Sequence, residues 1–496
     1  MDLREFRRRQ SHSVSFAGIT IGAENPIAVQ TMTNTSTNDI EASVEQIERI
    51  ASTGCKIVRL TAQGLREGEN LRHSVSRVRE KGLSTAIVAD IHFLPEVAAV
   101  AAQYVDKVRI NPGNYRLDRG DFERLIEQCR ERRVAIRVGV NHGSLAKRIF
   151  DEWGDTPEGM VAAAMEFLRI CRAQNFSDVV VSMKSSNTRV MVSAYRLLVE
   201  AMQSEGMSYP IHLGVTEAGN SLEGRIKSAV GIGALLSDGI GDTVRVSLTE
   251  APENEVPVAE MLVNHFSKRE GSFEVLHPEN YFPYFYKRRY NGGVLPIIHS
   301  EPMEGYTLLE AKSKNPSAEL RAAILNLNDS NQRVVVKCRY ESSDEVEVGV
   351  KAAADLGVLF LDGLADGIWV DAPNLSEESV RKIELMILQA TRVRFSHTEY
   401  IACPGCGRTL YNLEETLELI KSRTSHLKSL KIGVMGCIVN GPGEMADADY
   451  GYVGAAPGKI TLYKGREVIE RNIPQDEALE RLIELIKANG DWVESE

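Results

Sequence analysis

Short apolar segments alternate with longer amphipathic ones through the first half of the chain. The apolar segments are rich in valine and isoleucine, which favours β-strands, and the amphipathic ones carry apolar residues at helical spacing. Eight strands are predicted: Ile27–Thr31, Ile57–Thr61, Thr85–Asp90, Lys107–Asn111, Ala135–Asn141, Asp178–Lys184, Ile211–Glu217 and Thr243–Leu248. Helical patterns are predicted between them, such as Ile40–Thr53, Leu94–Tyr104, Asp121–Arg132, Pro157–Gln174, Thr188–Glu205 and Gly224–Leu236.

This alternation indicates a parallel sheet covered by helices. Eight strand–helix units within about 250 residues fit a (β/α)8 TIM barrel. A doubly wound open sheet is the alternative, but it does not require an eighth strand. Pro252 and Pro257 follow the last predicted strand and suggest that the chain leaves the barrel there.

A small α/β insertion is predicted next. Its expected strands are Arg333–Cys338 and Gly367–Val370, and its expected helices are Ser343–Leu356, which Gly357 would end, and Ser376–Ala390. The remaining unit mixes a helix (Glu414–Arg423), a strand (Lys431–Met435), a Gly-rich turn, a hairpin and a closing helix (Glu477–Asn489). We therefore divide the chain into a barrel over 1–255, an inserted α/β region over 256–395 and a C-terminal α+β domain over 396–496.

Composition limits the classes of partner. The 496 residues include 58 Lys and Arg against 69 Asp and Glu, so the formal net charge is 58 − 69 = −11. An acidic chain argues against nucleic acid as the main partner, because phosphate backbones require a basic face. Aromatic and basic residues gather over Tyr281–Tyr290, a combination that can bind single-stranded nucleic acid, but a packed linker is the better interpretation of that run in an acidic protein.

The expected cellular compartment follows from three features that the sequence does not show. No apolar run reaches the roughly 18 residues of a membrane span. The first sixteen residues have no apolar core of a secretory signal. Seven cysteines are too sparse and too unevenly spaced for a disulfide framework. We expect a cytoplasmic protein without a membrane partner.

A cysteine cluster marks the C-terminal domain. Cys403 and Cys406 form a C-x2-C pair, Cys437 follows a predicted strand, and Gly441-Pro-Gly443 could turn Glu444 back beside Cys437. A redox dithiol would not need Cys437. A zinc site could use the three cysteines with His426, although structural zinc usually takes ligands in two close pairs. An iron–sulfur cluster bound by three thiolates needs one other ligand, and Glu444 is the natural candidate; spacing alone favours this interpretation moderately over zinc.

Cations interrupt five of the predicted barrel strands, where apolar side chains are expected. They are Arg59, Arg109, Arg137, Lys184 and Arg245. A single buried cation normally indicates a structural ion pair. Five on separate strands of one sheet favour convergence on an anion, and the planar fork of arginine matches phosphate oxygens. A ligand with two phosphate groups would satisfy most of them.

Acidic residues stand near the ends of two of these strands. Asp90 and Glu217 could neutralise the arginines, or one of them could donate a proton. Glu217 is the preferred donor because it closes a strand beside a Gly-containing loop, and active sites of TIM barrels lie at that end of the strands. His92 could donate a hydrogen bond there, although a lone histidine is more often a packing residue.

Several longer motifs together resemble one enzyme family. They are Val88-Ala-Asp-Ile-His92, Arg109-Ile-Asn-Pro-Gly-Asn114, Arg137-Val-Gly-Val-Asn141, Gly214-Val-Thr-Glu-Ala-Gly219, Asp238-Gly-Ile-Gly-Asp-Thr-Val-Arg-Val-Ser-Leu248, Cys403-Pro-Gly-Cys406 and Gly436-Cys-Ile-Val-Asn-Gly-Pro-Gly-Glu444. With these motifs the chain resembles the 4-hydroxy-3-methylbut-2-en-1-yl diphosphate synthases of the methylerythritol phosphate route to isoprenoids.

The resemblance implies an activity and a cofactor. The family reduces 2-C-methyl-D-erythritol 2,4-cyclodiphosphate with two electrons, which open the ring and remove a hydroxyl as water, and takes them from ferredoxin or flavodoxin. Cys403, Cys406, Cys437 and Glu444 match the ligands of its [4Fe-4S] cluster.

The resemblance also implies roles in the barrel. Arg59, Arg109, Arg137 and Lys184 match the diphosphate clamp, and Glu217 matches the acid near the reacting carbons. Asp90, His92, Asn141 and Arg245 are expected to complete the substrate site.

The middle of the chain departs from the short members of the family. About 140 residues separate barrel and cluster unit in our division of the chain, which is similar to the three-domain, plant-type branch with a shortened insertion. Two-domain members form homodimers in which one cluster unit caps the partner's barrel, whereas a cap within one chain has been proposed for three-domain members. Two rival functions stay open at this point: a zinc-stabilised sugar-phosphate lyase or aldolase, and a non-catalytic iron–sulfur sensor.

Overall fold

A closed barrel of eight parallel strands forms the centre of the molecule. The computed structural model describes residues 7–92, 94–290, 292–329, 331–428, 430–439 and 441–494. The barrel strands are β3 (Ala28–Met32), β4 (Ile57–Ala62), β5 (Ala86–Ile91), β6 (Lys107–Ile110), β7 (Ala135–Asn141), β8 (Val179–Lys184), β9 (His212–Leu213) and β10 (Thr243–Val244). They pair in the order β8-β7-β6-β5-β4-β3-β10-β9, and a parallel bridge between Val181 and Ile211 closes the ring. This confirms the predicted TIM barrel.

Helices surround the barrel. They are α1 (Ile40–Ser52), α2 (Leu65–Glu80), α3 (Pro95–Ala101), α4 (Asp121–Arg132), α5 (Lys147–Trp153), α6 (Pro157–Ala173), α7 (Thr188–Ser204), α8 (Ser221–Ser237) and α9 (Glu255–Phe266). Helix α2 is only weakly marked in the sequence, because few apolar residues, chiefly Leu71 and Val78, form its buried face. Helix α9 was not predicted; it packs against β3 and begins at the predicted boundary of 255/256.

A β-hairpin covers the amino end of the barrel. Its strands β1 (Val14–Phe16) and β2 (Ile19–Ile21) bury Val14, Phe16 and Ile21 against side chains from the first halves of the barrel strands. Lys107 lies inside, with its Nζ 4.3 Å from the centroid of the Phe16 ring. A ligand site is therefore expected at the opposite, carboxyl end of the strands.

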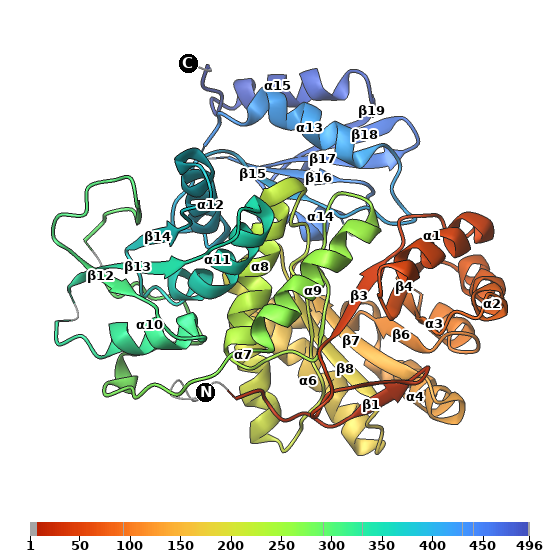
Figure 1. The fold of residues 1–496 in the computed structure, drawn as a ribbon. Helices are drawn as coiled ribbons and strands as arrows, with labels where there is room; N and C mark the ends of the chain where they lie inside the picture. Colours follow the sequence, from red (N-terminus) through yellow and green to blue (C-terminus); the bar gives the residue numbers. More distant parts are fainter. Residues whose placement is uncertain are drawn as a thin grey trace.

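The predicted small α/β insertion is present. Its parallel strands β11 (Ile297–Ile298), β12 (Tyr306–Glu310), β13 (Arg333–Arg339) and β14 (Gly367–Asp371) pair in the order β11-β14-β13-β12. Three helices accompany them: α10 (Pro316–Leu325), α11 (Glu345–Leu361) and α12 (Glu377–Ala390). Figure 1 shows the insertion beside the barrel, with α11 along α8. Barrel and insertion share one continuous hydrophobic core.

The prediction that Gly357 ends a helix is wrong. Helix α11 continues to Leu361, and Gly357 faces α8, where a Cβ atom would lie 3.0 Å from Cγ2 of Val230. On the other helix, a Cβ on Gly233 would lie 2.6 Å from the Cα of Ala354. These glycines therefore serve the close approach of two helix backbones rather than helix termination.

We expect the substitution Gly233→Ala to destabilise the protein although alanine is the better helix former. The new methyl group would meet backbone of α11, so the two helices must move apart at a cost of roughly 1–3 kcal/mol. Thermal unfolding measures the loss. Gly68→Ala in α2 is the matched control, because the three atoms nearest to its Cβ would be valine side-chain atoms at 3.3 to 3.6 Å. An equal loss of stability in both variants would contradict this explanation.

The C-terminal domain, here called the cap (residues 399–488), lies across the carboxyl end of the barrel (Figure 1). Its sheet runs in the order β15 (Glu399–Ala402), β16 (Lys431–Met435), β17 (Tyr450–Ala456), β18 (Lys459–Lys464) and β19 (Glu467–Pro474). Helices α13 (Leu413–Thr424), α14 (Gly441–Glu444) and α15 (Ala478–Ala488) complete it. The edge strand β19 was not predicted because its residues are mostly polar and exposed. The Gly-rich stretch predicted as a tight turn begins the short helix α14.

The aromatic and basic run Tyr281–Tyr290 packs against the insertion. The Tyr281 hydroxyl donates to Asp362 at 3.0 Å, and Arg288 and Arg289 each lie 3.3 Å from a carboxylate oxygen of Asp366. The run is thus a packed linker, as expected. Within the described residues, no helix is both long and apolar enough to cross a membrane.

Candidate active site

A cavity lies between the barrel and the cap. Its lining among the described residues is Met32, Arg59, Asp90, Arg109, Asn141, Lys184, Thr216, Glu217, Arg245, Ser247, Cys403, Pro404, Gly405, Cys406, Arg408, Thr409, Met435, Gly436, Cys437, Gly441 and Glu444. Every predicted site residue except His92 and Arg137 is in this set. The barrel supplies the cationic floor and the cap supplies the three thiols, so the fold joins two motifs that lie more than 150 residues apart in sequence.

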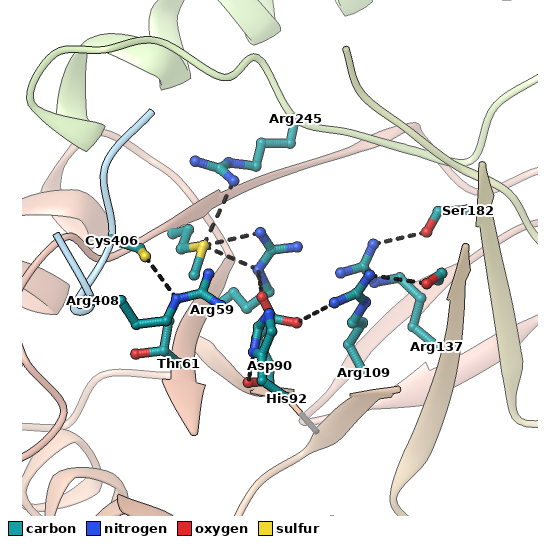
Figure 2. Close-up of polar contacts among 12 residues, drawn as sticks. Arg59, Thr61, Asp90, His92, Arg109, Arg137, Ser182, Arg245, Cys406 and Arg408 are labelled. Atoms are coloured by element: carbon teal, nitrogen blue, oxygen red, sulfur yellow. Dashed lines mark hydrogen bonds and ion pairs between the residues drawn. The ribbon is translucent and has the colours of Figure 1, made fainter. Parts of the chain in front are cut away.

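Two arginines and one aspartate form a buried network on the floor (Figure 2). Asp90 lies 3.1 Å from Nη1 of Arg109 and 3.4 Å from Nε of Arg59. Nη2 of Arg109 also donates to the carbonyl of Gly139 and to Oδ1 of Asn141, both at 2.9 Å. Burial alone would raise the pKa of Asp90, but the two guanidinium groups hold that pKa well below its ordinary value. Asp90 therefore acts here as the arginines' counter-ion, the simpler of the two interpretations of its charge.

Lys184 and Arg245 differ in how their charges are balanced. Arg245 forms a bidentate ion pair with Glu255, with both N–O distances at 3.0 Å, which is a structural pairing. Lys184 is 4 % exposed, and burial together with repulsion from Arg59 lowers its pKa well below the ordinary value. The floor therefore favours an added anion, which would stabilise the charged form of Lys184.

His92 and Arg137 are not among the described residues that line the cavity. Nδ1 of His92 is 3.1 Å from the carbonyl oxygen of Asp90, and burial lowers the pKa of the imidazole well below its ordinary value. Arg137 is fully buried in the barrel, where Nη1 donates to Oγ of Ser182 at 2.9 Å. Its Nε and Nη2 have no hydrogen-bond partner in the part of the chain that the structure describes. Both roles in substrate binding stay predictions.

Glu217 reaches the cavity from a backbone turn that few non-glycine residues adopt. Its φ is +50°, in the left-handed region, a conformation that costs of order 1–3 kcal/mol and recurs at functional sites. The side chain is 2 % exposed. Burial, with a smaller contribution from the charge of nearby Glu444, raises the pKa of Glu217 well above the ordinary value. Burial thus favours the protonated form of this carboxyl group, which lines the cavity.

The three cap cysteines are free thiols that line the cavity from above. The backbone N–H of Gly436 donates to Sγ of Cys403 at 3.2 Å, and burial raises the pKa of the Cys403 and Cys437 thiols. The other four cysteines are buried away from this lining, as predicted for structural residues. No three His, Cys, Asp or Glu side chains in the described ranges converge on a point fit for a single metal ion. A four-iron cluster does not need such a point, because each protein ligand binds a different iron.

The cap rests on the barrel of its own chain. Nδ2 of Asn141 donates to Oε1 of Glu444 at 3.1 Å, and the Thr249 hydroxyl donates to the Cys403 carbonyl at 2.9 Å. A bridge pairs the backbones of Ala218 and Ala402. These contacts hold two of the predicted cluster ligands against the carboxyl ends of the barrel strands within one polypeptide.

Arg408 is a site residue that the sequence reasoning missed. Its Nε donates to Sγ of Cys406 at 3.0 Å, and its guanidinium faces Arg59 and Asp90 (Figure 2). The available signal was a cation two positions after the second cysteine of the C-x2-C pair.

Family models match both ends of the chain. The GcpE TIM-barrel domain matches residues 11–260, and the GcpE protein C-terminal domain matches residues 399–488. Both matched segments contribute to the cavity.

Curated relatives match the chain throughout. Proteins named 4-hydroxy-3-methylbut-2-en-1-yl diphosphate synthase (flavodoxin) from Phocaeicola vulgatus and Porphyromonas gingivalis are 45 % and 43 % identical to it, with 100 % of each chain covered. The protein of that name from Bacteroides fragilis is 44 % identical, covering 100 % of this chain and 98 % of its own. The alignments extend over 579 to 615 positions, more than the 496 residues here, so the relatives carry segments that this chain lacks. The chain belongs to the 4-hydroxy-3-methylbut-2-en-1-yl diphosphate synthase (GcpE) family.

Proposed function

We propose that this chain reduces 2-C-methyl-D-erythritol 2,4-cyclodiphosphate to 4-hydroxy-3-methylbut-2-enyl diphosphate. Two electrons and two protons are consumed, the ring opens, and one hydroxyl leaves as water. One observation supports this most: three free thiols and a glutamate of the cap face a floor of cations across a single cavity. A redox centre and a diphosphate can therefore be held in contact.

The cofactor of this proposal is a [4Fe-4S] cluster held by Cys403, Cys406, Cys437 and Glu444. The donor set fits, because all four side chains line the same cavity and the thiols are not oxidised to disulfides. When bound, the cluster supplies electrons one at a time and a Lewis-acidic iron. Glu444 would be the weakest ligand of the set, because a carboxylate binds this iron less strongly than a thiolate, and Nδ2 of Asn141 donates to its Oε1 at 3.1 Å.

The barrel residues bind the substrate in this mechanism. Arg59, Arg109 and Lys184 form the clamp for the two phosphates, with Asn141 and Arg245 beside them. Arg137 supports the clamp from deeper in the barrel, and His92 supports it next to Asp90. Charge-assisted hydrogen bonds to phosphate are each worth roughly 1.5–3 kcal/mol. The network around Asp90 keeps the guanidinium groups oriented before substrate arrives, which reduces the entropy lost on binding.

Glu217 donates a proton to the departing hydroxyl. Its carboxyl group lines the cavity from the barrel side, close to Glu444 of the cap. The cap contacts shield the cavity from water, so that reduced intermediates are not quenched by solvent protons. Binding residues and redox ligands thus belong to separate domains, and closure brings them together.

The electron donor in this proposal is a flavodoxin, as the names of the curated relatives suggest, with ferredoxin as the alternative. The cap and barrel of one chain form the site, which is compatible with a cytoplasmic monomer; a homodimer would have to pair through other surfaces. In this proposal each domain has one role: substrate binding for residues 1–255, support of the cap for 256–395 and electron transfer for 396–496.

Arg109→Met should weaken substrate binding by 100-fold or more. The substitution removes one clamp cation, whose charge-assisted hydrogen bonds to phosphate are worth roughly 1.5–3 kcal/mol each, while Asp90 stays paired with Arg59. The dissociation constant of the cyclic diphosphate, measured by calorimetry, reports the loss. Arg124→Met, on the exposed face of α4, is the control and should bind normally. Equal affinity in Arg109→Met and wild type would exclude Arg109 from the clamp.

Anaerobic turnover with a reconstituted cluster tests the function. Purified protein is supplied with iron, sulfide, the cyclic diphosphate and reduced flavodoxin, and the product is identified by mass spectrometry. We expect 4-hydroxy-3-methylbut-2-enyl diphosphate. A zinc-dependent lyase would instead yield carbonyl fragments without reductant, and a sensor would yield no product; either result would contradict the proposal.

A further inference from the structure

Arg408 bridges the cap cysteines and the cationic floor. It follows the C-x2-C pair on the loop between β15 and α13, and its side chain extends from the cap toward the barrel (Figure 2). The adjacent Gly407 packs so closely on the barrel that a Cβ would lie 2.5 Å from the Thr35 carbonyl oxygen. The loop is thus packed tightly onto the barrel directly before Arg408.

The two edges of the Arg408 guanidinium have different surroundings. Nε donates to Sγ of Cys406 at 3.0 Å. Nη1 is buried and has no hydrogen-bond partner within the described residues. A buried charged donor without an acceptor is costly in free energy. Because Arg408 lines the cavity, its Nη1 is suited to donate to an anionic oxygen of the ligand.

We propose that Arg408 is a positioning residue that couples the cluster to the substrate. This rests on the proposed function. Through Nε it donates to the thiolate of Cys406, which stabilises the more negative, reduced state of the cluster and raises the reduction potential. Through Nη1 it donates to a phosphate oxygen of the cyclic diphosphate, as a clamp residue contributed by the cap rather than by the barrel.

Only arginine suits both contacts. Its planar fork presents Nε and Nη1 at a fixed separation, whereas the lysine ammonium is one compact donor on a flexible stem. Arg408→Lys should therefore keep the charge but lose one of the two hydrogen bonds, and Arg408→Gln should lose the charge as well.

Redox titration of the reconstituted enzyme tests this proposal. The midpoint potential is followed anaerobically by visible absorbance and electron paramagnetic resonance, without substrate, and iron and sulfide contents are measured for each variant. We expect a more negative potential in Arg408→Gln than in wild type and about tenfold weaker binding of the cyclic diphosphate. Arg423→Gln, on the exposed side of the cap helix α13, should change neither quantity.

The results for Arg408 and the results for the cofactor can be told apart. An unchanged potential in a fully loaded Arg408→Gln enzyme would overturn the role of Arg408. If Arg408→Gln holds no cluster, Arg408→Lys is measured in its place. A wild-type midpoint potential together with wild-type substrate affinity in Arg408→Lys would also overturn the proposal. Wild-type protein that binds no iron and sulfide would instead refute the proposed cofactor.

Discussion

Cys437→Ser should abolish the visible absorbance of the cluster and reduce turnover below detection. Cys437 stands where β16 ends and faces the cavity together with Cys403 and Cys406. A serine hydroxyl is a far poorer iron ligand than a thiolate, and Glu444 already fills the one non-thiolate position of the proposed set. The loss should therefore concern the cofactor rather than the fold.

Cys338→Ala is the matched control for this variant. Cys338 is equally a free thiol, but it is buried in β13 of the insertion, outside the active-site cavity. We expect it to keep wild-type iron and sulfide contents. Circular dichroism of Cys437→Ser should remain that of the folded protein. Turnover by Cys437→Ser, or loss of the cluster from Cys338→Ala, would contradict the ligand set.

Glu217→Gln should lower the turnover number by about 10²–10⁴-fold, the usual contribution of a positioned general acid. The amide has nearly the same shape, so the left-handed backbone at this position can be kept. It cannot donate a proton to a leaving hydroxyl with comparable ease. Affinity for the cyclic diphosphate should change little, because the clamp cations remain.

Rapid-quench kinetics and calorimetry separate the two effects. Glu414→Gln, an exposed acid on α13, serves as the control and should retain wild-type turnover. Glu217→Asp keeps an acid but withdraws it from the cavity, so an intermediate rate is expected. Unchanged turnover in Glu217→Gln would remove Glu217 from the mechanism, and a loss confined to affinity would make it a binding residue.

Strand positions could be predicted from sequence because barrel strands are short, apolar and separated by amphipathic helices. All eight predicted strands overlap observed ones. The last two are shorter than predicted: β9 stops at Leu213, four residues before the left-handed backbone at Glu217, and β10 stops at Val244. The local pattern of apolar and polar residues does not determine the residue at which such a strand stops pairing with its neighbours.

Residues of the site could be predicted where a charged residue interrupts an apolar strand, as at Arg109 and Lys184. The ion-pair partners of these residues and their depth in the barrel could not be predicted. Arg245 is paired with Glu255, which follows in the sequence as the first residue of α9, and Arg137 lies below the cavity. Arg408 gave no periodic signal, because it lies on a loop whose position depends on tertiary contact. The docking of the cap on its own barrel likewise depends on contacts between distant segments, such as Asn141 with Glu444.

The insertion offers a physical reason for that docking. Arg392, which follows α12, pairs with Glu399 at 3.0 Å and with Asp447 at 2.9 Å, and both acids belong to the cap. Arg189 of the barrel donates to the carbonyl oxygens of Thr391 and Arg392 at 2.9 and 2.7 Å. The connection between insertion and cap is therefore fixed to the barrel, which orients the cap over the same chain.

A single-turnover experiment tests whether electrons from the cluster drive the conversion of the cyclic diphosphate. Enzyme with a fully reduced cluster is mixed with the cyclic diphosphate in the absence of oxygen and of any free reductant except a measured amount of reduced flavodoxin. We predict that cluster reoxidation and product formation proceed together, with one 4-hydroxy-3-methylbut-2-enyl diphosphate formed for every two electrons consumed. Product formed without electron consumption, or reoxidation that leaves the cyclic diphosphate intact, would contradict the account.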